Sequence, residues 1–183
     1  MKISTARSQF SQPTLFDPGD VPLGNHGHIR GVLGNFAEEL TAKLFRHKTD
    51  STCNYCPDVV RGSVYFECKA MGKSNQTFVY AGRLDKDREF AQDHWLGYAV
   101  WWHGVDTSRA RTVRELQTLF LCELRGLFVV PFEVIDTLCS ARPAEKLNSK
   151  YGKCGPGTLY GSGYRLNARE LLPWLFLSWE IED

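Results

Sequence analysis

One segment limits the possible fold more than any other part of the chain: residues 58–70 have the pattern of two short strands joined by a tight Arg-Gly turn. Because side chains in a strand alternate between its two faces, one face of the second strand is wholly apolar. That face fits a buried core: Val64, Phe66, Cys68, Ala70. The other face carries Glu67 and Lys69, and the first strand adds Asp58. The hairpin therefore predicts a sheet with a core on one face and converging ionisable groups on the other.

Three charged groups on one sheet face suit a divalent cation. Mg²⁺ takes oxygen ligands, usually one or two protein carboxylates, and keeps water and substrate phosphate for its other positions. Asp58 and Glu67 would hold the ion, which lowers the pKa of a bound water and polarises a phosphoryl oxygen. Lys69 would orient or help deprotonate that water and offset charge building on the phosphorus. The alternative is an exposed face whose ion pairs contribute roughly 0–1 kcal/mol to stability.

The flanking segments predict an α/β domain. Apolar residues at spacings of three and four indicate a helix from Leu33 to about His47. The order helix, hairpin, helix, strand is typical of a mixed central sheet flanked by helices. The other expected elements are a polar loop over 71–77, a helix over 84–95, a buried strand over 97–102, a hairpin of 118–124 with 127–130, and a helix after Pro131.

Composition divides the chain into three regions. Residues 1–30 are rich in proline, glycine and serine and lack periodicity, so they predict an N-terminal arm. Residues 31–140 form the expected core. Residues 141–183 form a C-terminal extension, made of a basic, glycine-rich loop and a last helix. Asn167 followed by Glu170 has the pattern of a capping box at the start of that helix.

The stretch PDVVRGSVYFECK resembles the PD-(D/E)XK nuclease superfamily, the fold of many restriction endonucleases and of archaeal-type Holliday junction resolvases. The resemblance covers residues 31–103 and includes a helix with an acidic residue ahead of the hairpin. Here Gly34 stands four residues before Glu38. At about 100° per residue, Glu38 lies at the edge of the apolar face of the helix, while Glu39 points away from it. Only Glu38 would reach toward a metal.

The resemblance implies a restriction endonuclease-like core with an active site at the hairpin. Asp58 and Glu67 would bind the metal, Glu38 would complete or assist the site, and Lys69 would position the attacking water. The implied function is that of a Mg²⁺-dependent DNA endonuclease, with Mn²⁺ able to substitute. A short chain with a compact core favours a structure-selective enzyme of the Holliday junction resolvase kind, which would cut two strands symmetrically as a homodimer.

Two other functions stay open. A type II restriction endonuclease would need extra elements that read base edges in the major groove, and the last eighty residues of the chain can supply them. A non-catalytic DNA-binding protein would keep the nuclease fold and bind DNA through its basic C-terminal region. The complete set of Asp58, Glu67 and Lys69 weighs against this second alternative.

Basic residues mark a candidate DNA surface. Between Arg142 and Arg169 there are six basic residues against one acidic residue, with tyrosines and glycines between them. Phosphate contacts from basic side chains, together with aromatic platforms, are the ingredients of nucleic-acid binding; the alternative is a solvated loop. A second basic cluster flanks the proposed site. The residues expected to contact DNA are Lys73, Arg83, Lys146, Lys150, Lys153 and Arg165.

Charge and hydropathy exclude some classes of protein. The net charge of +1 argues against a strongly basic protein that binds nucleic acid non-specifically. The sequence has no run of about 18 apolar residues and no signal-peptide pattern, so we expect a soluble, cytoplasmic protein without a membrane partner. Its six cysteines should then be mostly reduced. Whether the CxxC pair Cys53 and Cys56 binds zinc stays open.

Overall fold

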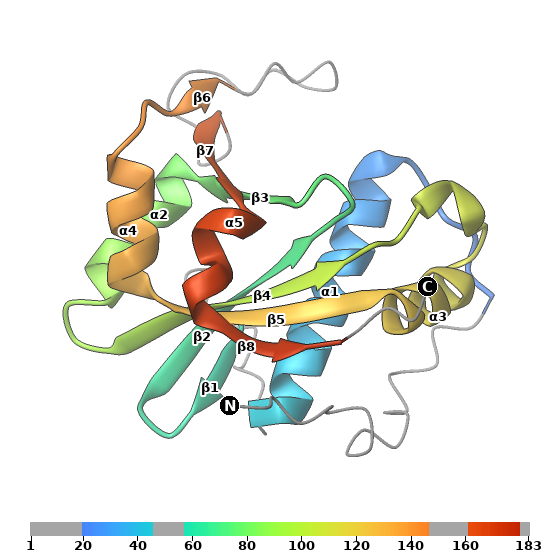
Figure 1. Ribbon diagram of the computed structural model, residues 1–183, viewed down its shortest axis with the longest axis horizontal. Coiled ribbons are helices and arrows are strands. Elements are labelled where there is room, and N and C mark those ends of the chain that lie inside the picture. Colours follow the sequence, from blue (N-terminus) through green and yellow to red (C-terminus); the bar gives the residue numbers. More distant parts are fainter. Residues whose placement is uncertain (1–19, 46–56, 147–160, 180–183) are drawn as a thin grey trace.

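A five-stranded mixed sheet forms the centre of the protein in the computed structural model, which describes residues 20–45, 57–146 and 161–179 (Figure 1). The strand order is β1-β2-β4-β5-β8. Strands β2 and β4 run parallel, and the other neighbouring pairs are antiparallel. The bounds are β1 Val59–Arg61, β2 Val64–Met71, β4 Trp95–His103, β5 Leu124–Pro131 and β8 Leu175–Ser178.

Helices cover both faces of this sheet. The buried side chains of α1 and α3 join the core on one face, and those of α2, α4 and α5 join the core on the other. The helices are α1 His26–Phe45, α2 Ala81–Phe90, α3 Val113–Cys122, α4 Phe132–Ser140 and α5 Ala168–Leu171, with 3₁₀ turns at Thr107–Arg109 and Leu172–Trp174. None of the helices in the described ranges is long and apolar enough to cross a bilayer.

A second, smaller sheet has the order β3-β7-β6 and lies to one side of the central sheet (Figure 1). Its strands are β3 Gln76–Tyr80, β6 Glu145–Lys146 and β7 Ser162–Asn167. Gly163 on β7 faces Phe78 so closely that a Cβ at position 163 would lie 2.4 Å from the Phe78 ring. A residue without a side chain is therefore required where these two strands pair.

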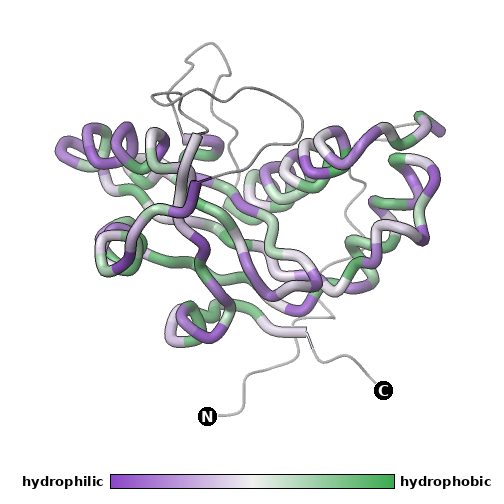
Figure 2. The backbone as a smooth tube through the Cα atoms, turned by 90° about the horizontal axis from the view of Figure 1, so that it is seen from above, coloured by the Kyte–Doolittle hydropathy of each residue, from purple (hydrophilic) through white to green (hydrophobic). Residues whose placement is uncertain are grey.

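Strand β4 supplies side chains to both cores. Leu96, Tyr98 and Val100 contribute to the core beneath α2 and α4, whereas Ala99 and Trp101 contribute to the core beneath α1 and α3. Burial on both faces explains why the sequence of this strand is a continuous apolar run. Hydrophobic and hydrophilic positions alternate along the helices in Figure 2, as expected for helices that bury only one face.

The structure confirms the elements predicted around the hairpin. The two hairpin strands are β1 and β2, the apolar run is β4, and the helix after Pro131 is α4. Helix α1 begins at His26 rather than Leu33, so its first turns lie in the region assigned to the N-terminal arm. The Asn25 side chain accepts a hydrogen bond from the His28 N–H there, which satisfies an otherwise unpaired donor of the first turn.

Two predicted segments were wrong. The hairpin of 118–124 with 127–130 does not form. Most of its first predicted strand belongs to helix α3, which covers residues 113–122, and its second predicted strand lies in β5. Thr112 and Glu115 form a reciprocal capping box that starts this helix, and Leu116 and Phe120 bury one of its faces. The loop expected over 71–77 contains the start of β3, whose partner β7 lies almost ninety residues away.

The C-terminal region completes the central sheet instead of ending in a helix. The capping box at Asn167 and Glu170 is present, but α5 has only four residues. Pro173 follows, and a proline inside a helix removes a hydrogen bond and clashes with the preceding turn. The chain then forms β8, which pairs with β5 at the edge of the sheet. Part of the region from 141 onward therefore belongs to the core: β8 extends the central sheet, and Leu166, Ala168 and Leu171 are buried in it.

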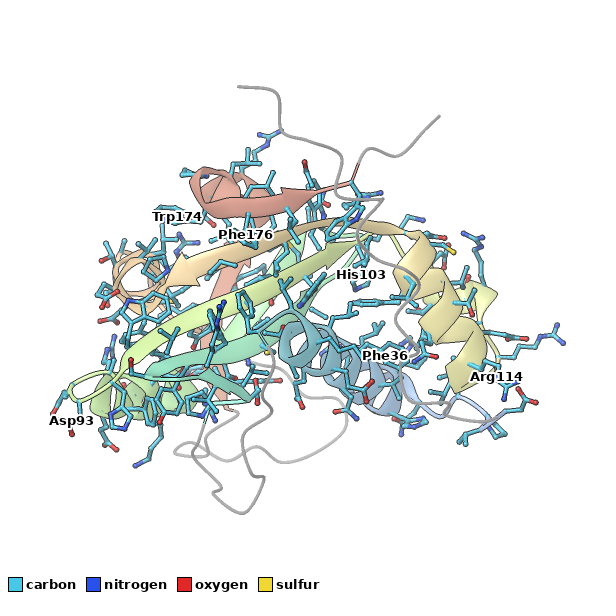
Figure 3. All side chains as sticks on the ribbon, turned by 90° about the horizontal axis from the view of Figure 1, so that it is seen from below. Phe36, Asp93, His103, Arg114, Trp174 and Phe176 are labelled. Atoms are coloured by element: carbon cyan, nitrogen blue, oxygen red, sulfur yellow. The ribbon has the colours of Figure 1, made fainter. Side chains whose placement is uncertain are left out.

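His103 ends β4 as a buried side chain, and its titration should make stability depend on pH. It is 2% exposed, its Nδ1 accepts from the Val105 N–H at 3.3 Å, and its ring lies 4.9 Å from that of Phe120. Figure 3 shows the labelled His103 and Phe36 in the part of the molecule between α1 and α3. Burial, helped by the charge of Arg125, lowers the pKa of His103 to about 4.

Between pH 6.5 and 4 the unfolded chain therefore binds a proton that the folded chain does not bind. The contribution of His103 to the free energy of unfolding should be fully present above pH 6.5 and should fall by about 3 kcal/mol as the pH drops toward 4. Urea denaturation of the protein and of the His103→Gln variant checks this, because the variant should lack this part of the pH dependence. Parallel pH profiles for the two proteins would contradict it.

Candidate active site

Asp58 lies at the point where the pairing of β1 with β2 ends. The last ladder pair is Val59 with Phe66, so the same register sets Asp58 opposite Glu67. Asp58 Oδ2 accepts a hydrogen bond of 2.7 Å from the N–H of Cys68. This contact ties the carboxylate to the β2 backbone one residue beyond Glu67.

Glu67 is a buried carboxylate bound by two cations. It is 4% exposed, which excludes the alternative of a solvent-exposed charged face. Its Oε1 lies 2.5 Å from Lys69 Nζ, and its Oε2 lies 2.5 Å from Arg83 Nη2 on α2. Strand alternation turns Glu67 and Lys69 to the same face, and α2 covers that face. A buried carboxylate needs such partners, because desolvation of an unpaired charge is costly.

Asp87 and Tyr98 extend this network behind Arg83. Arg83 Nε donates to Asp87 Oδ1 at 3.0 Å, one turn along α2. The Tyr98 hydroxyl on β4 donates to the other oxygen, Asp87 Oδ2, at 2.5 Å. Glu67 and Tyr98 are neighbours in the parallel β2–β4 pair, which explains why the groups around them meet. The chain of contacts runs from Lys69 through Glu67, Arg83 and Asp87 to Tyr98.

The carboxylates of this site repel one another. Burial, and then the charge of Glu67, raise the pKa of Asp58 to about 7, and the charge of Glu38 adds to the effect. Burial and Glu67 likewise raise the pKa of Asp87 to about 6. Glu38 on α1 is therefore close enough for its charge to act on Asp58. An additional positive charge would relieve this repulsion.

The two cations of the site keep their protons. Burial alone would lower the pKa of Lys69, but Glu67 and then Asp58 reverse the effect and hold that pKa above its ordinary value. The same balance, with Glu67 and Asp87 as the acidic partners, raises the pKa of Arg83. Among the described residues, the groups whose charges act on one another here are the acidic Glu38, Asp58, Glu67 and Asp87 and the basic Lys69 and Arg83.

This donor set fits a cation that needs few protein ligands. Within the described residues, no group of three or more histidine, cysteine, aspartate or glutamate side chains is arranged to hold a metal. Asp58, directly before β1, and Glu67 on β2 instead form a pair of carboxylates. Mg²⁺ uses such a pair and completes its shell with water and phosphate oxygens. The residues are therefore compatible with Mg²⁺ and offer no full protein cage of the kind that structural zinc requires.

The residues expected to contact DNA have different surroundings. Lys73 is 67% exposed and lies 3.5 Å from Asp106. Arg165 on β7 pairs with Glu145, and Lys146 is exposed on β6. Arg83 is engaged with Glu67 and Asp87 inside the site rather than on an open basic surface. Outside the described residues lie Lys150, Lys153, Cys53 and Cys56.

Asp87 and Tyr98 were not among the residues expected at the site, and Arg83, which is expected to contact DNA, pairs with Glu67 and Asp87 in the structure. Two signals pointed to them. Arg83 and Asp87 are four residues apart and so share a helix face with each other. Tyr98 stands inside an otherwise apolar buried strand, where a hydroxyl needs a hydrogen-bond partner. Neither signal indicates that Arg83 binds Glu67, because that contact depends on how α2 packs on the sheet.

A scan against protein-family models and searches of curated proteins and of solved structures gave no match to this chain. The interpretation of the site therefore depends on its residues and their geometry.

Proposed function

We propose that this protein is a Mg²⁺-dependent DNA endonuclease with a restriction endonuclease-like core. One observation carries the proposal: Asp58 and Glu67 stand side by side at the end of a strand pair, with Lys69 bound to Glu67. This is the residue set of the PD-(D/E)XK resemblance, and the order helix α1, hairpin β1–β2, helix α2, strand β4 agrees with it. The buried, electronegative surroundings favour cation binding.

Each residue has a role in phosphodiester hydrolysis. A bound Mg²⁺ would polarise a phosphoryl oxygen and make its water more acidic. Asp58 and Glu67 would hold it, and Glu38 would add negative charge beside Asp58. Lys69, which stays an ammonium, orients the attacking water and neutralises charge on the phosphate rather than serving as the base. The water oxygen bonds to phosphorus and its proton passes to solvent. One phosphorus–oxygen ester bond breaks, and the leaving oxygen takes a proton from solvent and departs as an alcohol.

The substrate that we propose is branched DNA. A junction resolvase cuts two strands symmetrically, so this proposal includes a homodimer with one site in each copy. A type II restriction endonuclease is the alternative within the same chemistry. Digestion of plasmid beside a synthetic four-way junction separates the two. Paired nicks at the junction support a junction resolvase. Discrete, sequence-dependent plasmid fragments would instead identify a type II restriction endonuclease.

The direct test incubates the purified protein with linear duplex, single-stranded and four-way-junction DNA, with and without Mg²⁺. We expect cleavage only with the metal, restored by Mn²⁺ and stopped by EDTA. Cleavage of the junction should exceed that of the other two substrates. Cleavage that is equally fast in EDTA, or none with any substrate in either metal, would contradict the proposed activity.

A non-catalytic DNA-binding function is favoured by one feature. Both oxygens of Glu67 already have cationic partners, so the network satisfies itself without a metal. Calorimetry with Mn²⁺ distinguishes the two functions, and it should be repeated with a duplex present because metal affinity can be weak without phosphate ligands. Binding that is lost in the Asp58→Asn variant supports the nuclease. The absence of any such binding would favour the DNA-binding protein.

A further inference from the structure

The carboxyl ends of the parallel strands β2 and β4 meet at one corner of the central sheet. Met71 and Trp102 are neighbours in the ladder there, and a turn over residues 72–75 follows β2. In open α/β sheets, ligands bind outside the carboxyl ends of parallel strands. Trp102 lies four residues beyond Tyr98 on β4, so the corner is about 13 Å from that end of the carboxylate network, on the same face of the sheet.

Arg125 on β5 is a half-buried cation at this corner, and no carboxylate in the described part of the chain pairs with it. Its guanidinium lies 5.6 Å from the centre of the Trp102 ring, and its Nη1 donates to Asn75 Oδ1 at 3.5 Å. Its Nε is buried and has no acceptor among those residues. Gly104 makes room for the group, because a Cβ there would lie 2.9 Å from Arg125 Nη2. Such a cation is costly to keep without a counter-charge, and a bound anion would supply one.

Asn75 and Lys73, both on the turn after β2, add further donors. Asn75 Oδ1 accepts from Trp102 Nε1 at 2.8 Å as well as from Arg125. Both neighbours can only donate, so the carbonyl oxygen of Asn75 faces them and its NH₂ group remains for another acceptor. The ammonium of Lys73 is exposed, and its 3.5 Å contact with Asp106 is of the weak surface kind. The corner therefore offers two cations and an amide donor to an anion.

We propose that Arg125, Asn75 and Lys73 form a second DNA site, which binds a backbone phosphate of the substrate away from the scissile bond. This inference rests on the proposed endonuclease function, which supplies DNA as the ligand. A guanidinium matches the geometry of phosphate oxygens and can donate to two of them. Phosphate contacts set the position of the nucleic acid on the protein and carry no sequence information. The site would thus hold DNA over the carboxylates whatever its sequence, as a structure-selective enzyme requires.

The main test measures the affinity for a four-way junction by fluorescence anisotropy, in EDTA so that no strand is cut, over a series of salt concentrations. For Arg125→Gln, affinity at about 0.1 M salt should fall about fivefold, because one phosphate contact is lost. The plot of log affinity against log salt concentration should become shallower by about 0.9, which a residue that only supports the fold would not cause. Affinity and slope equal to those of the unmodified protein would overturn the inference.

Arg109→Gln is the matched control. It removes the same charge close to the same corner, since Glu123 binds Arg109 through its side chain at 2.5 Å and Gly104 through its backbone carbonyl. Arg109 already has a carboxylate partner, so its loss should change junction affinity by less than about twofold and leave the salt slope unaltered. Equal effects of the two variants would show that net charge alone is responsible and would overturn the site.

The Asn75→Asp variant keeps the proposal testable if Arg125→Gln folds poorly. Asn75 has a positive φ of 57°, which aspartate also tolerates, and the new carboxylate would give Arg125 the partner that it lacks. We expect a higher melting temperature together with a junction affinity about tenfold lower, because the guanidinium is neutralised and a negative charge faces the phosphate. A gain in stability with unchanged DNA affinity would contradict the proposal.

The remaining outcomes separate the second site from the proposed activity and from a small-anion site. Arg125-dependent junction binding without cleavage in Mg²⁺ or Mn²⁺ would support the site and overturn the endonuclease. Cleavage of DNA whose binding does not depend on Arg125 would do the reverse. Calorimetry with inorganic phosphate is the last arm. Binding tighter than about 0.1 mM that Arg125→Gln abolishes, beside unchanged junction affinity, would assign the corner to a small phosphate compound and overturn the DNA contact.

Discussion

Replacement of Asp58 by asparagine should reduce Mg²⁺-dependent DNA cleavage by at least about 10³-fold, equivalent to about 4 kcal/mol of lost transition-state stabilisation. The variant removes one of the two carboxylates that we assign to the metal. It keeps the side-chain shape and an oxygen that can accept from the Cys68 N–H. Burial and Glu67 already disfavour the charged form of Asp58, so the neutral amide should be tolerated in the fold.

The measurement is the rate of junction cleavage in Mg²⁺, with melting temperature recorded at pH 8 in EDTA. We expect a melting temperature equal to or above that of the unmodified protein, because the variant removes a repulsive charge beside Glu67. Glu39→Gln is the control for the loss of a carboxylate. Glu39 is not among the groups whose charges shift the pKa of Asp58 or Asp87, so this variant should change cleavage by less than about twofold. Normal cleavage by a folded Asp58→Asn protein would remove Asp58 from the mechanism.

Replacement of Trp101 by alanine should lower the free energy of unfolding by about 4 kcal/mol. Trp101 is 1% exposed at the centre of the core beneath α1. Its indole N–H donates to Thr41 Oγ1 at 2.8 Å, and its ring stacks on Trp179 at 6.0 Å. The variant leaves a large cavity and removes the hydrogen bond that joins β4 to α1, the helix that carries Glu38.

Urea denaturation measures the effect, with Trp95→Ala as the control on the same strand. Trp95 is 43% exposed, so its removal should cost only about 1 kcal/mol. The denaturation midpoint should fall strongly for Trp101→Ala without a change in slope, because a loss of stability leaves the surface exposed on unfolding unaltered. Equal losses for the two tryptophans would show that the packing around Trp101 is not what holds α1 on the sheet.

The hairpin was predictable because its pattern is local. Alternation assigns Phe66 and Cys68 to one face and Glu67 and Lys69 to the other, and the structure has this arrangement. Residues 118–124 were predicted wrongly, because a short apolar run fits a strand and a helix equally well. The capping box at Thr112 was the deciding signal, and the burial of Phe120 against Phe36 of α1 agrees with it.

The strand β8 shows a different kind of failure. Residues 175–178 follow a correct helix start at Asn167, and nothing local indicates that the chain returns to pair with β5. The same holds for β3, whose partner is β7 across a long separation in the sequence. Strand pairing between distant segments depends on which edges remain open after the core has assembled, and single-sequence patterns do not encode that.

The amino-acid order alone determined the charged hairpin, the acidic position on α1 and the α/β class, because each arises from contacts or periodicities within a few residues. Only the tertiary structure decided that the charged face of β2 is buried under α2. Packing of that helix places Arg83 and Asp87 against Glu67, and the parallel neighbour β4 adds Tyr98. A buried charge must have partners, and where those partners come from is a property of the packed molecule.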